Sequence, residues 1–107
     1  MKRKIRVEIG SGNVFADIGL PNPEERLAKA RLAMQINDII EGRRLTQLQA
    51  AKLLGIDQPK VSALRNGRLA IFSLERLMQF LVRLGRDINI VVETRARSRG
   101  QGRLRVA

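Results

Sequence analysis

The sequence predicts one mainly α-helical domain of four to five helices that ends in a short β-strand. Apolar residues recur at helical spacing in four segments between residues 23 and 84, and a glycine follows each segment. From Asp87 to Glu93 the pattern changes to alternation, and β-branched residues dominate. The chain has 107 residues, of which 44% are hydrophobic. This is enough for one modest core.

The first helix is predicted from Pro23 to Glu41. Asn22 can cap it, proline suits the first helical position, and the two glutamates that follow favour the positive end of the helix dipole. Gly42 is expected to end this helix. Its buried stripe is predicted to consist of Ala28, Leu32, Ile36, Ile39 and Ile40.

Three shorter helices are predicted to follow. The second is capped by Thr46 and runs through Leu54, the third covers residues 58–65, and the fourth is capped by Ser73 and stops at Gly85. Their inward-facing residues are predicted to be Ala50, Leu53, Leu54, Ile56, Val61, Leu64, Leu74, Leu77, Met78, Leu81 and Leu84.

On both sides of the helical domain, which covers residues 22–93, the chain is expected to be less regular. Residues 1–21 are interpreted as a basic arm with a short strand at residues 5–9 and a turn at residues 10–13. The strand at 87–93 cannot satisfy its own backbone groups, so it needs the N-terminal strand or its own copy in a second subunit. Residues 94–107 are rich in Arg, Ser and Gly and are interpreted as a flexible tail.

The composition argues against several classes of function. The chain has no cysteine and no histidine, and no phosphate-binding glycine loop or metal-ligand cluster, so we expect no enzyme activity, no metal and no cofactor. Its three aromatic residues are too few for a base-stacking surface. No segment approaches the roughly 20 apolar residues of a membrane span, and no secretion signal is recognisable. A cytoplasmic protein associated with the nucleoid is therefore expected, without a membrane.

The net charge of +11 is concentrated at the two ends of the chain. Nine of the 21 Lys and Arg residues lie within residues 2–6 and 95–105, whereas residues 9–93 hold 12 basic and nine acidic residues. A positive field attracts nucleic acid. An ordinary solvated tail explains each terminal run about as well.

Residues 46–67 form the most informative segment. Two short helices joined by the three residues Gly-Ile-Asp can cross at the wide angle of a helix-turn-helix, and Ala50 is small where the helices approach most closely. Asn66 and Gly67 end the second of these helices. That helix would leave polar, cationic or small side chains exposed, as insertion into the DNA major groove requires. These residues are Gln58, Pro59, Lys60, Ser62, Ala63 and Arg65.

This segment resembles the Xre/phage-repressor family of helix-turn-helix proteins, and the flanking helices extend the resemblance over about residues 23–84. The matching features are Thr46-Gln47, Ala50-Ala51, Gly55, Val61-Ser62 and Asn66-Gly67. The Asn-Pro-Glu-Glu start at residues 22–25 and the strand after the fourth helix look like the HigA-type antitoxin subgroup. The resemblance implies a repressor of transcription that binds double-stranded operator DNA. The subgroup implies an antitoxin that binds a small toxin protein and represses its own operon.

The resemblance also assigns DNA contacts to individual residues. Gln47 would contact phosphate, and Gln58 would read a base edge, with adenine as its natural bidentate partner. Pro59 departs from the polar residue often found at its position and offers only apolar contact. The remaining positions implied to contact bases or phosphates are Thr46, Lys60, Ser62, Arg65, Asn66 and Arg68, with Arg43 and Arg44 flanking the site. Simpler explanations are a helix cap for Thr46 and Gln58, and a solvated helix face for Lys60 and Arg65.

A homodimer is expected, because one helix-turn-helix reads few base pairs and two copies one helical turn apart read more. The strand that contains Ile88, Ile90 and Val92 could form the dimer interface by pairing with its symmetry mate. Two alternatives stay open. The protein could be a stand-alone regulator without a toxin, and the arginine-rich tail departs from the acidic surface expected of a partner of a basic toxin. It could also bind RNA through its basic ends.

Overall fold

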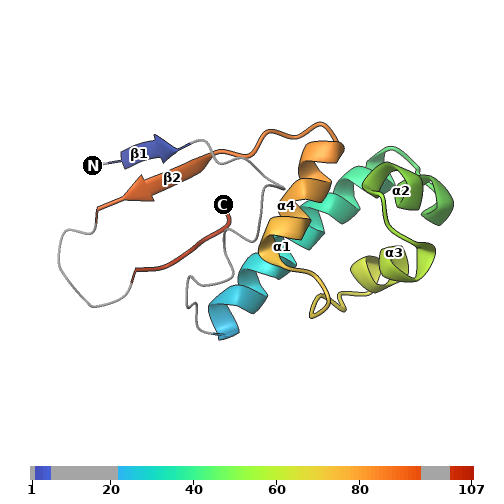
Figure 1. The fold of residues 1–107 in the computed structure, drawn as a ribbon, viewed down its shortest axis with the longest axis horizontal. Helices are drawn as coiled ribbons and strands as arrows, with labels where there is room; N and C mark the ends of the chain where they lie inside the picture. Colours follow the sequence, from blue (N-terminus) through green and yellow to red (C-terminus); the bar gives the residue numbers. More distant parts are fainter. Residues whose placement is uncertain (1, 6–21, 95–101) are drawn as a thin grey trace.

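The computed structural model describes residues 2–5, 22–94 and 102–107. It consists of four helices and two short strands, so the predicted fold class is confirmed. In chain order the elements are β1 (Lys2–Ile5), α1 (Asn22–Gly42), α2 (Gln47–Leu54), α3 (Gln58–Arg65), α4 (Leu74–Arg83) and β2 (Ile90–Glu93). Figure 1 shows the paired strands at one end of the molecule and α2 with α3 at the other, while α1 and α4 pack together between them.

The hydrophobic core lies where the four helices meet. Every helix contributes at least one side chain that is completely buried, and each such side chain stabilises the fold by roughly 1.5–3 kcal/mol. These residues include Ile36 from α1, Leu54 from α2, Val61 and Leu64 from α3, and Leu77 and Phe80 from α4. The ring of Phe80 meets that of Phe72 edge to face, with centroids 5.7 Å apart. The Arg76 guanidinium lies 5.0 Å from the centroid of the Phe80 ring. All five residues predicted for the stripe of α1 are buried.

Two helical residues differ from the sequence prediction in whether their side chains are buried or exposed. In α2 the buried arc runs over Ala50, Ala51 and Leu54, so Leu53 lies outside it and is 38% exposed. In α3 Ala63 was expected to be exposed but is only 8% exposed. Ala63 instead belongs to the hydrophobic core, and the chain after α3 turns back over this helix end, where the Arg68 N–H donates to the Ala63 carbonyl at 2.9 Å.

The first helix also ends differently. Gly42 is its last residue rather than its stop, and the left-handed residue is Arg44, with φ of 54°. The Leu45 N–H donates to the Ile40 carbonyl and the Arg44 N–H to the Glu41 carbonyl, both at 3.0 Å. This is the Schellman arrangement, which commonly places glycine where Arg44 stands. At its start, α1 already includes Asn22, which was predicted to precede it as the cap.

The strands pair within one chain. β1 runs antiparallel to β2, with Lys2 opposite Glu93 and Ile5 opposite Ile90. β1 therefore begins at Lys2, three residues before the predicted start at Ile5. Residues 6–9 and the predicted turn at 10–13 lie outside the described residues. β2 begins at Ile90 rather than at the predicted Asp87, and Ile88, which precedes it, packs against the helical core.

The last residues of the chain are not a free tail. Leu104 and Val106 are partly buried against the helical core, and the Val106 carbonyl accepts a hydrogen bond of 2.8 Å from Arg31 Nη1 of α1. The flexible tail predicted from residue 94 onward is therefore wrong for this stretch, whereas residues 95–101 lie outside the described part. None of the helices in that part has the length and apolar character of a membrane span.

Two glycines should respond oppositely to alanine substitution. Gly42 is helical, and a Cβ there would meet nothing within 4 Å, so Gly42→Ala should raise the free energy of unfolding by about 0.5–1 kcal/mol. Gly55 has φ of 72°, and a Cβ there would lie 2.8 Å from Arg83 Nη1. Gly55→Ala should therefore lower the free energy of unfolding by about 1–2 kcal/mol. Urea unfolding of both variants measures the difference, and a destabilised Gly42→Ala would contradict the helical end described above.

Candidate nucleic-acid interface

Helices α2 and α3 form a compact pair at one end of the molecule (Figure 1). Residues 55–57 join them, as predicted, and Gly55 takes a left-handed conformation that ends α2. The Arg83 side chain of α4 lies directly beside Gly55. The turn therefore depends on glycine for its backbone angles and for the close approach of α4.

The first turn of α3 presents free side chains to solvent. Asp57 caps this helix through a 2.9 Å hydrogen bond from the Lys60 N–H to Asp57 Oδ1, so Gln58 is not needed as a cap. Gln58, Pro59 and Lys60 are all exposed. Within the part of the chain that the structure describes, neither Gln58 nor Lys60 has a side-chain hydrogen bond or ion pair. On the opposite side, Val61 and Leu64 anchor the helix in the core.

The start of α2 combines a complete cap with an exposed glutamine. The Gln49 N–H donates to Thr46 Oγ1 at 3.1 Å, and the Thr46 N–H donates to Gln49 Oε1 at 2.9 Å, which together form a capping box. Thr46 is therefore a helix cap, as its simpler explanation required. Gln47, the first residue of α2, is exposed beside it.

Three further predicted DNA contacts, besides Thr46, have partners inside the protein. Arg65 Nη2 lies 3.1 Å from Glu41 Oε1 of α1, and Ser62 Oγ accepts a hydrogen bond of 3.3 Å from Asn66 Nδ2. Ser62 is also only half exposed. Arg68 is exposed, although its backbone N–H is engaged with α3. The structure thus leaves the side chains of Gln47, Gln58, Pro59, Lys60 and Arg68 open to solvent at this end of the molecule.

Sequence reasoning missed two residues that shape this site. Asp57 was assigned to the turn, although an aspartate directly before a helix is a recognisable capping signal. Asn37 of α1 donates through Nδ2 to the Leu64 carbonyl at 3.2 Å. No local signal could have found that contact, since the two residues are 27 positions apart.

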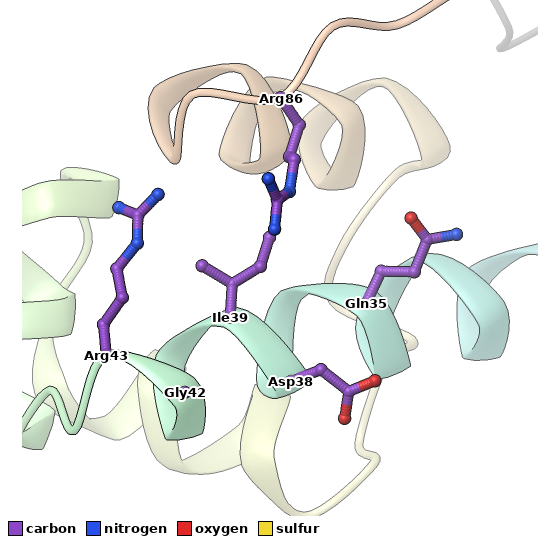
Figure 2. Close-up of a pocket in the computed structure, with 6 residues that line it drawn as sticks. All are labelled: Gln35, Asp38, Ile39, Gly42, Arg43 and Arg86. Carbon is purple, nitrogen blue, oxygen red and sulfur yellow. The ribbon is translucent and has the colours of Figure 1, made fainter.

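A pocket of about 400 Å³ lies away from α3, between the second half of α1 and the segment after α4. Figure 2 shows Arg43 and Arg86 extending there, while the Asp38 carboxylate turns away from both. Arg43 Nη2 donates to the Leu84 carbonyl at 2.6 Å, so this arginine serves the negative end of α4. The described residues contain no group of acidic side chains that could hold a metal ion.

Comparison with known proteins agrees with this geometry. A family model described as a helix-turn-helix domain matches residues 14–93. A solved structure titled an XRE-family transcriptional regulator superposes with a TM-score of 0.74 at 50% sequence identity, covering 81% of this chain and 98% of that chain. None of the curated proteins matches. The extent of the two matches shows that this chain belongs to the XRE family of helix-turn-helix proteins.

Proposed function

We propose that this protein is a transcriptional regulator that binds double-stranded operator DNA by placing α3, the recognition helix, in the major groove. The observation that carries the proposal is the first turn of α3, where exposed Gln58 and Lys60 are left without partners among the described residues. The helix is meanwhile capped and anchored in the core, so these side chains are presented on a rigid support. The XRE-family relative, itself titled a transcriptional regulator, supports the same function.

The exposed side chains suit different parts of a DNA duplex. Gln58 can accept from and donate to one adenine in the major groove, and Pro59 can contact a thymine methyl group. Lys60 can reach a base edge or a phosphate. Gln47 and Arg68 suit phosphates, which position the protein without reading sequence.

The hydroxyl groups and Asn66 play a smaller part in the proposed complex. Thr46 Oγ1 and Ser62 Oγ each accept one hydrogen bond within the protein. Each hydroxyl keeps a proton that it can donate to a phosphate oxygen. Asn66 can reach a phosphate by exchanging its bond to Ser62 for one to DNA.

A homodimer completes the proposed regulator. Within the described residues β2 pairs only with β1, so its other edge can pair with the β2 of a second copy. A four-stranded sheet would then hold two recognition helices for two half-sites. Ile90 and Val92 would lie in this interface, whereas Ile88 packs on its own helical core and would only support the strand.

A second candidate function is that of an antitoxin, which would bind a small toxin as well as its own operator. Its support is the resemblance of residues 22–25 and of the strand after α4 to the HigA-type subgroup. The positive charge of the chain argues against a basic toxin as the partner. Co-purification of a small protein encoded next to this gene would favour this function, and purification of the regulator alone would favour a stand-alone role.

Gln58→Ala should weaken binding to the DNA upstream of the gene by about 1–3 kcal/mol, because it removes a bidentate base contact. Binding to a scrambled duplex should hardly change. Lys60→Ala should reduce the slope of log affinity against log salt by about one if Lys60 contacts a phosphate. Titration of labelled duplexes across a salt series measures all of these quantities.

Gln35→Ala is a matched control, because Gln35 is also exposed but lies on α1 at the pocket of Figure 2. It should leave both affinities unchanged. Equal binding of upstream duplex, scrambled duplex and duplex RNA would contradict the proposed function and point to the basic ends of the chain.

Ile90→Asp should convert the dimer into monomers with reduced operator affinity, because it places a charge in the proposed strand interface. Val82→Asp adds the same charge at an exposed position of α4 and should leave the dimer intact. Sedimentation velocity reports both states. A wild-type protein that sediments as a monomer would contradict the strand-paired dimer.

A further inference from the structure

Three hydrogen bonds join the last turn of α3 to the second half of α1. Arg65 Nη2 lies 3.1 Å from Glu41 Oε1, and Arg65 Nη1 donates to the Asn37 carbonyl at 3.4 Å. In the opposite direction, Asn37 Nδ2 donates to the Leu64 carbonyl at 3.2 Å. Asn37 and Glu41 are four residues apart and therefore lie on the same face of α1. We call these three bonds the α1–α3 clamp.

The clamp fixes a geometry rather than only neutralising charge. Two of its three acceptors are backbone carbonyls, which cannot follow a moving side chain. The planar guanidinium of Arg65 uses two different nitrogens for two different acceptors, so its orientation is defined, which the ammonium of a lysine could not achieve. Asn37 also adds a hydrogen bond to the Leu64 carbonyl in the last turn of α3, where the backbone bond from the Gly67 N–H is long, at 3.4 Å.

The position of the clamp matters because α3 is short. The helix has eight residues, and Gln58 lies seven residues before Arg65, which is about 10 Å along the axis. A change of tilt at the clamped end therefore moves the side chains at the free end. A bidentate contact with a base tolerates such movement poorly, whereas a contact with a phosphate tolerates it better.

From this geometry we infer that Arg65, with Glu41 and Asn37, positions the recognition helix and determines sequence specificity without itself contacting DNA. The inference rests on the proposed DNA-binding function. It assigns a specificity role to Glu41 and Asn37 of α1, and it replaces the direct DNA contact that the family resemblance implied for Arg65.

Glu41→Gln separates the two roles of Arg65. If Arg65 contacted DNA, removing the competing carboxylate would free it and raise DNA affinity. If the clamp positions α3, Glu41→Gln should instead lower the ratio of upstream to scrambled duplex affinity by about two- to fivefold, the range expected for one exposed ion pair. Arg65→Gln should lower this ratio to a similar extent, and the double variant should do little further harm, since both changes break the same interaction.

Two controls carry the same charge changes elsewhere. Asp38→Asn removes an exposed carboxylate from the same helix, and Arg86→Gln removes an exposed arginine after α4. Both should leave the affinity ratio unchanged. As a readout without DNA, amide hydrogen exchange of residues 61–65 should become faster in Glu41→Gln and Arg65→Gln and stay as in the wild type in both controls.

The outcomes distinguish the clamp from the proposed function. A wild-type protein that does not prefer the upstream duplex would refute the proposed function, and the exchange rates alone would then decide whether the clamp holds α3. The inference is overturned if Glu41→Gln raises affinity for the upstream duplex, if the two substitutions act additively on the ratio, or if exchange in α3 does not respond to either.

Discussion

The structure depends on the burial of one face of α3 against α1 and α2. Helices of eight residues are marginal in isolation, so α2 and α3 cannot hold their mutual angle by themselves. Val61 and Leu64 fill the core from α3, and Phe80 closes it from α4. These contacts determine which face of α3 is buried, and therefore which residues its first turn presents to solvent.

Some polar side chains at the candidate interface stabilise the protein itself, and others remain available to bind a partner. Thr46 and Asp57 satisfy the first turns of α2 and α3, and Asn37 and Arg65 tie the end of α3 to α1. The side chains of these four residues are occupied by hydrogen bonds within the protein. The remaining exposed side chains, such as Gln58, are therefore the ones left to meet a partner. Local helix caps and contacts between distant residues together determine which polar residues of α3 are structural and which are available for binding.

The sequence predicted the features that local signals encode. Capping residues and glycines located α2, α3 and α4 closely, because a helix end is determined within a few residues. Contacts between distant residues left no such signal. Three features each join residues at least 20 positions apart: the pairing of Arg65 with Glu41, the register of the two strands and the packing of Leu104 against the core. Their geometry exists only once the chain has folded.

The most direct test of this account maps the amide resonances of the full-length, isotope-labelled protein that shift when duplex DNA from upstream of its gene is added. We expect the largest shifts at the starts of α2 and α3 and at residues 66–68. Residues around the pocket at Arg43 and Arg86 should stay largely unperturbed. Shifts confined to the basic ends of the chain, with α3 unaffected, would contradict it.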